Sequence, residues 1–76
     1  MRRFTDSRGH TWDVVVGRES FGALYAIFAP VAGNPEGPRQ TLLPGDSKAE
    51  AGRELDDLTE DELATLFERS ERKRLA

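Results

Sequence analysis

The fold of this chain is decided by residues 47–72, whose sequence is SKAEAGRELDDLTEDELATLFERSER. This stretch contains two Ser/Thr-x-x-Glu patterns, one beginning at Ser47 and the other at Thr59. In such a capping box the first hydroxyl accepts the backbone N–H of the glutamate, and the glutamate accepts the backbone N–H of the first residue. We therefore expect two helices, over about 48–56 and 60–72.

Each predicted helix carries a thin apolar stripe. The two stripes are Ala51, Leu55 and Leu58 in the first helix, and Leu63, Leu66 and Phe67 in the second. Such spacing is typical of helices that place one face on a core and leave the other in water. Two stripes of this width can cover one face of a small sheet, so we expect the helical segment, 47–73, to pack on one side of what precedes it.

Residues 1–43 alternate in the manner of strands and are interrupted by glycine and proline. The pattern predicts strands at about 4–6, 10–16, 21–29 and 39–43. Short glycine-containing connections between such runs are typical of antiparallel hairpins. The predicted fold class is therefore α+β. It has a three- to four-stranded antiparallel meander followed by two C-terminal helices packed on one face, in a single domain over residues 1–76.

The predicted strand at 21–29 is apolar on both faces. Phe21, Ala23, Tyr25 and Ile27 fall on one side, and Leu24, Ala26 and Phe28 fall on the other. A strand of this kind is usually covered on both sides. We expect the helices to cover the face that holds Trp12, Phe21 and Tyr25. Leu24 and Phe28 would then remain for a partner.

Composition limits the classes of protein that the chain can belong to. The 76 residues include one histidine and carry a net charge of −3. They include no cysteine, which excludes a disulfide framework and a thiolate metal site. No apolar run follows the two arginines near the start, and the longest mostly apolar stretch, 21–32, is too short to span a bilayer. We expect a cytoplasmic protein without a membrane segment.

No pattern indicates an enzyme, a cofactor or a metal site. Asp6 could face His10 across the first hairpin, with Ser7 in the turn, but a triad by composition alone is a weak basis for a hydrolytic or small-ligand site. The acids at 54–62 lack the spacing of a calcium loop, and 17–22 lacks that of a phosphate loop. We therefore predict no catalytic residue, no cofactor and no metal ligand.

Nucleic-acid binding is the alternative function that the sequence leaves open. An accessory protein of this kind would use the arginines near the N-terminus, namely Arg2, Arg3, Arg8 and Arg18. However, residues 1–40 contain five basic and four acidic side chains, which is a small excess for a phosphate-binding surface.

The function that the sequence favours is a non-enzymatic module for protein interaction or self-association, with a second copy or another protein as its partner. The residues expected at the interface are Leu24, Phe28, Val15 and Arg18. The opening, Phe4-Thr5-Asp6 followed by Gly9 and Trp12, is similar to the start of many short hairpin-led bacterial proteins, which implies no residue role. We predict a small bacterial-type protein that forms homo-oligomers.

Overall fold

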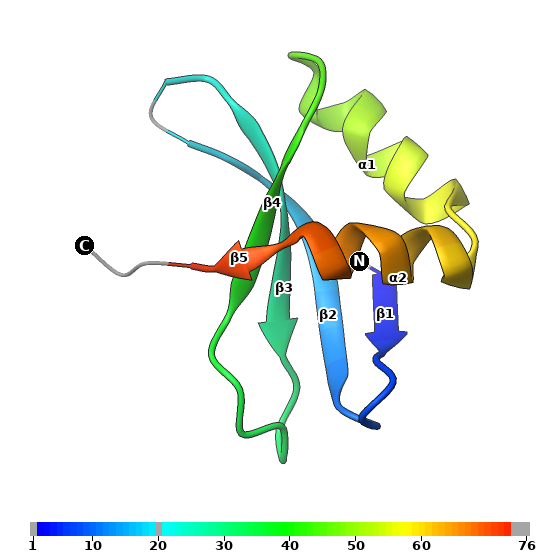
Figure 1. Cartoon of the computed structure of the whole chain (residues 1–76). Helices are drawn as coiled ribbons and strands as arrows, with labels where there is room; N and C mark the ends of the chain where they lie inside the picture. The colour runs from blue at the N-terminus through cyan, green and yellow to red at the C-terminus, as the bar shows by residue number, and fades with distance from the viewer. Residues whose placement is uncertain (1, 20, 74–76) are drawn as a thin grey trace.

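A computed structural model describes residues 2–19 and 21–73. The elements follow in the order β1 (Arg2–Thr5), β2 (Thr11–Arg18), β3 (Leu24–Pro30), β4 (Arg39–Leu43), α1 (Lys48–Asp57), α2 (Glu60–Arg69) and β5 (Glu71–Arg72). All strand pairs are antiparallel, and the strands lie side by side in their chain order (Figure 1). The predicted α+β class is confirmed, with one more strand than expected.

The extra strand, β5, forms where α2 ends earlier than predicted. The helix stops at Arg69 because Ser70 has an extended backbone, with φ of −72° and ψ of 154°, and its N–H turns back to the carbonyl of Phe67. The chain then runs beside the first half of β4, where Glu71 pairs with Gln40. Strand β5 therefore covers part of the edge of β4.

The connection between β2 and β3 sets how the faces of these strands match. Strand β2 runs to Arg18 and β3 begins only at Leu24, later than the predicted start at residue 21. Glu19 N donates to the carbonyl of Ala23, and Gly22 closes the turn with a φ of +83°, a region that favours glycine. Apolar residues in this turn continue the pattern expected of a strand, which explains why the start of β3 was predicted too early.

Both helices begin where their caps predict. At Thr59 the capping box is complete, since Glu62 N donates to Thr59 Oγ1 at 3.1 Å and Thr59 N donates to Glu62 Oε1 at 2.8 Å. The hydrogen bond from the backbone N–H of Thr59, followed by the interaction of the Thr59 side chain with the same carboxylate, lowers the pKa of Glu62. At Ser47 one half of the box is seen, in which Glu50 N donates to the hydroxyl at 3.2 Å.

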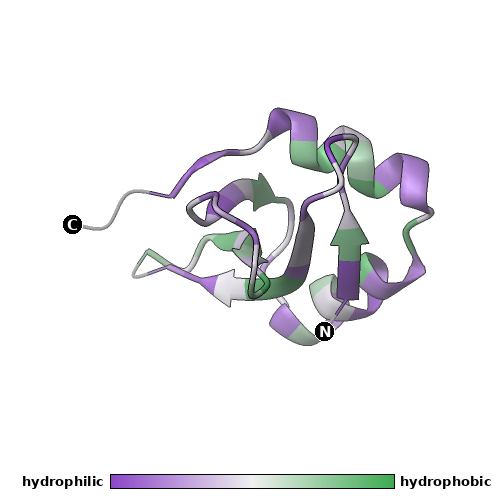
Figure 2. Ribbon diagram, turned by 90° about the horizontal axis from the view of Figure 1, so that it is seen from below, coloured by the Kyte–Doolittle hydropathy of each residue, from purple (hydrophilic) through white to green (hydrophobic). Residues whose placement is uncertain are grey.

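The core lies between the helices and one face of the sheet. Its buried members are Phe4, Trp12, Val14, Ala26 and Phe28 from the strands and Leu55, Leu63 and Leu66 from the helices. The ring of Phe67 lies 5.1 Å from the rings of both Trp12 and Phe28. Figure 2 shows hydrophobic and hydrophilic segments alternating along α2, as expected for a helix with one buried face.

The predicted assignment of the sheet faces is wrong for β3. Leu24 and Phe28 are 0% exposed, whereas they were expected on the uncovered side. Val14 pairs directly with Phe28, so even-numbered residues of both strands face the helices. A loop longer or shorter by one residue would have reversed this relation, because a one-residue shift moves every side chain to the other face. Trp12 lies under the helices, as predicted.

Candidate functional site

The face of the sheet opposite the helices is the candidate functional surface, and we call it the open face. The strand registers place on it Arg3, Thr5, Thr11, Asp13, Val15, Gly17, Tyr25, Ile27, Ala29, Gln40 and Leu42. Within residues 2–19 and 21–73, the helices contribute their buried leucines only to the core on the other side. The open face is therefore left uncovered by the described elements.

The open face is apolar at its centre and polar at one margin. Val15 pairs with Ile27 at the centre, and Tyr25 pairs with Leu42 beside them. At the β1 margin the side chains are polar: Arg3 Nε lies 3.0 Å from Asp13 Oδ1, and the hydroxyls of Thr5 and Thr11 are 3.2 Å apart. Protein interfaces commonly combine an apolar core with a polar rim.

A glycine inside β2 allows the centre of this face to pack closely. A Cβ placed on Gly17 would collide with Cδ1 of Ile27, so the isoleucine side chain lies across the bare backbone of its neighbour. The missing Cβ of Gly17 thus leaves the space that the end of the half-buried Ile27 side chain occupies.

Two large apolar side chains of the described residues are exposed to water. Leu42 on the open face is 57% exposed, and Phe21, in the turn before β3, is 95% exposed. Phe21 and Tyr25 line the same depression, of about 330 Å³, at the β5 end of the sheet. The same depression also contains polar and charged side chains, among them Gln40 and Lys73, so Phe21 and Tyr25 are apolar positions within a mixed surface. Exposed large apolar side chains on a small protein are often part of an interaction site.

Of the four residues expected at an interface, the structure places only Val15 on the open face. Leu24 and Phe28 are buried under the helices. Arg18 is exposed on the helix side, where its guanidinium donates to the carbonyl of Asp46 at 2.8 Å. The structure therefore does not bring this set together.

Ile27, Tyr25 and Leu42 are the open-face residues that the interface prediction missed. The signal that could have found them is the length of the turn between Arg18 and Leu24, which fixes which residues of β2 and β3 share a face.

The N-terminal arginines do not gather into one basic surface. Arg2 donates to the carbonyl of Asp56 at 2.8 Å on the helix side, whereas Arg3 lies on the open face beside Asp13. Arg8 pairs with Glu36 at 3.6 Å. These arginines lie on different sides of the sheet, so their arrangement does not form one basic surface for a nucleic-acid backbone.

Asp6 and His10 form a turn rather than a proton relay. Asp6 Oδ1 accepts the backbone N–H of Arg8 at 2.9 Å and of His10 at 3.0 Å, and Oδ2 accepts Trp12 Nε1 at 3.1 Å. Burial raises the pKa of Asp6, but these hydrogen bonds and the His10 charge together outweigh it and lower that pKa. His10 Nδ1 lies 3.9 Å from Oδ2, too far for a hydrogen bond that would orient the ring.

Neither a cluster of metal ligands nor a membrane-spanning helix is found among residues 2–19 and 21–73. No group of three or more His, Cys, Asp or Glu residues converges in a way that could hold a metal ion. None of the helices has the length and apolar character needed to cross a bilayer.

Comparison with known proteins finds no match to this chain among protein families, curated proteins or solved structures.

Proposed function

We propose that this chain is a small non-enzymatic module that associates with a second copy of itself through the open face. The observation that supports this proposal is the apolar centre made by Val15, Tyr25, Ile27 and Leu42. In an antiparallel sheet with one solvated face, these positions are normally polar. A twofold dimer is the commonest assembly for a small chain, because one patch then serves both partners.

The dimensions of the molecule are compatible with such a dimer. Its principal extents are 32 × 31 × 19 Å, so it has two broad faces and a short third dimension. A stable interface buries about 800 Å² on each partner. A broad face of this size can supply that area, whereas a narrow edge cannot.

The charges around the apolar centre also favour a second copy. Arg3 and Asp13 stand at one margin, and Glu71 stands in the strand at the other edge of the sheet. A rim that contains both signs can complement itself across a twofold axis, whereas a strongly charged partner would meet repulsion on one side.

Light scattering over a range of concentrations tests the proposal. We expect the apparent mass to rise from the 8.5 kDa of one chain toward twice that value. Leu42→Asp and Phe21→Asp should keep the protein monomeric, because each buries a charge in the interface while altering a side chain that is exposed in the monomer.

Ala49→Asp is the matched control, since Ala49 is exposed on α1, away from the open face. This variant should associate like the wild type. A wild-type protein that stays monomeric at high micromolar concentration would refute self-association. Salt-sensitive binding to DNA or RNA by that monomer would support the nucleic-acid alternative instead.

A further inference from the structure

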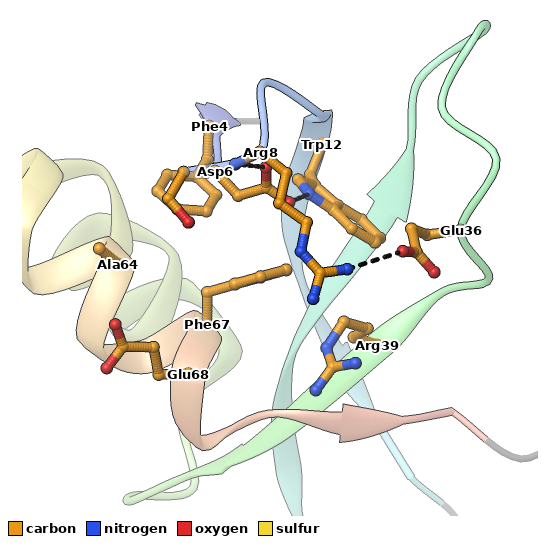
Figure 3. A pocket seen from close by; sticks show the side chains of 10 residues that line it. Phe4, Asp6, Arg8, Trp12, Glu36, Arg39, Ala64, Phe67 and Glu68 are labelled. Atoms are coloured by element: carbon orange, nitrogen blue, oxygen red, sulfur yellow. Dashed lines mark hydrogen bonds and ion pairs between the residues drawn. The ribbon is translucent and has the colours of Figure 1, made fainter.

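A second concave site lies on the helix side of the sheet, away from the open face. This pocket, of about 300 Å³, is bounded by the β1–β2 turn, α2 and the start of β4 (Figure 3). Phe4, Trp12 and Phe67 form its floor, with the Phe67 ring 5.4 Å from that of Phe4 and 5.1 Å from that of Trp12. Phe4 and Trp12 are buried, so the half-buried Phe67 and Ala64 offer the accessible apolar surface.

Arg39 forms one wall of the pocket and is held in place by three contacts with two residues. Its Nε donates to Ser70 Oγ at 2.8 Å, its Nη2 donates to Ser70 O at 2.6 Å, and its guanidinium carbon lies 5.3 Å from the centroid of the Phe67 ring. Within residues 2–19 and 21–73, Nη1 donates no hydrogen bond to another side chain or carbonyl. The contacts with Ser70 and Phe67 therefore fix the orientation of the guanidinium, and the N–H groups of Nη1 remain available to a ligand.

The charge of Arg39 is not matched by an acid in the described part of the chain. Half-buried Arg2 and Lys73 pair with Glu60 and Glu19, but Arg39 forms no salt bridge with an acid of residues 2–19 or 21–73. Arg53, which also lacks an acidic partner there, is exposed to water. A partly desolvated cation is normally paired, so Arg39 is suited to an anion that enters from the pocket.

A second arginine reaches the same pocket from the β1–β2 turn. Figure 3 shows Arg8 extending toward Glu36, which it meets at 3.6 Å. The Arg8 side chain is 77% exposed and this ion pair is long, so the pair contributes little and can be exchanged for another anion. Three acids line the pocket. Glu36 pairs with Arg8, Asp6 already accepts hydrogen bonds from three N–H groups, and Glu68 is exposed.

We propose that this pocket binds a small organic carboxylate, with Arg39 and Arg8 contacting the carboxylate and Phe67 receiving the apolar body of the ligand. A guanidinium presents paired donors that match the two oxygens of a carboxylate. The pocket volume is at the lower end of the range for small-molecule sites, about 300–1,000 Å³. The proposal is independent of self-association, because the pocket and the open face lie on opposite sides of the sheet.

NMR titration of the full chain with three probes tests the proposal. The probes are 3-phenylpropionate, phenethylamine, which replaces the acid by an amine, and propionate, which lacks the ring. We expect 3-phenylpropionate to shift the amide signals of Phe67 and Ser70 with a Kd on the order of 1 mM, and propionate to bind at least about tenfold more weakly. Phenethylamine should leave these signals in place.

Variants assign the binding to individual side chains. Arg39→Leu should weaken 3-phenylpropionate binding by about tenfold or more, and Arg8→Ala by about threefold. Glu68→Gln should strengthen it by about twofold, because a negative charge at the rim is removed. The control is Arg53→Ala, which removes an exposed arginine on α1 and should not alter binding.

Glu68→Gln and Arg8→Ala alter exposed side chains, so they decide the question even if Arg39→Leu fails to fold. Equal or tighter binding of phenethylamine would overturn the proposal, because the acids and not the arginines would then select the ligand. An absence of shifts at Phe67 and Ser70 at 10 mM probe, which is about ten times the expected Kd, would overturn it as well.

Discussion

Among single residues, Asp6 forms a cluster of hydrogen bonds within the first hairpin. Its carboxylate accepts three N–H groups, one of them from the buried indole of Trp12. In the sequence, Asp6 was considered as a carboxylate that could face His10 in a hydrolytic site. The structure instead shows an aspartate whose oxygens fix the turn and the tryptophan, which is a local structural role.

Replacing Asp6 by asparagine should lower the free energy of unfolding by about 1.5–3 kcal/mol at pH 7, because charge-assisted hydrogen bonds are lost. The pKa of Asp6 is lower in the folded protein, so its stabilisation is complete above the pKa of the unfolded chain. It disappears as the pH falls through the folded pKa. We therefore expect the free energies of unfolding of the wild type and Asp6→Asn, measured with denaturant from pH 7 to pH 2, to become equal at the lowest pH values.

Asp46→Asn serves as the control for this experiment, because the Asp46 side chain is exposed and is not among the groups that hold the turn. It should follow the wild type at each pH. A constant difference between wild type and Asp6→Asn down to pH 2 would contradict the role of the carboxylate charge.

Replacing either of two glycines by alanine should change the stability of the protein, in opposite directions. Gly52 lies inside α1 and has open space where a Cβ would stand, so Gly52→Ala should stabilise the protein by about 0.5–1 kcal/mol. Gly33 has a φ of +92°, so Gly33→Ala should destabilise it. Thermal melts compare both with the wild type, and shifts of the same sign would contradict this explanation.

At the scale of elements, the start of α2 is the best-defined boundary in the chain. Both reciprocal bonds of its capping box form, with acidic residues throughout the first turn and Arg69 in the last. These charges complement the helix dipole at both ends. All of these contributions come from residues close together in the sequence, which explains why the boundary was predicted correctly.

Thr59→Ala should lower the free energy of unfolding by about 1 kcal/mol, because the N–H of Glu62 loses its acceptor. Thr65→Ala is the matched control in the same helix. The Thr65 hydroxyl donates to the carbonyl of Asp61, a bond that adds little to an exposed helix, so this change should be close to neutral. Equal melting temperatures for Thr59→Ala and wild type would mean that the cap does not stabilise α2.

At the scale of the whole molecule, the sheet separates two surfaces with different properties. The helix side contains the core and the pocket beside Arg39, and the other side is the open face. Their separation depends on the pairing of β2 with β3, since that register decides which apolar residues of β3 enter the core.

Aspartate substitutions on the two sides should therefore have different consequences. Leu24→Asp places a charge at a site that is 0% exposed and should unfold the protein, with a loss of about 3 kcal/mol or more. Leu42→Asp alters an exposed side chain and should change the melting temperature little. Circular dichroism melts at a concentration where the wild type is monomeric distinguish the two. A folded Leu24→Asp protein with a normal melt would contradict the observed register.

Local sequence patterns were enough to predict the class of the fold, the starts of both helices, the range of β4 and the hairpin that joins β1 to β2. These features depend on caps, turn residues and alternation, which act over a few neighbouring positions. Which side of β3 faces the helices was seen only in the three-dimensional structure. It depends on whether the turn between β2 and β3 contains an even or an odd number of residues. The tertiary structure also decided the formation of β5 and the placement of Arg39 on Ser70, which lies 31 positions away in the chain. Contacts of that separation leave no local pattern, so the pocket beside Arg39 could not be obtained from the sequence alone. The open-face residues of β3 and β4 were missed for a different reason, because the apolar residues of the turn before β3 concealed the length of that turn.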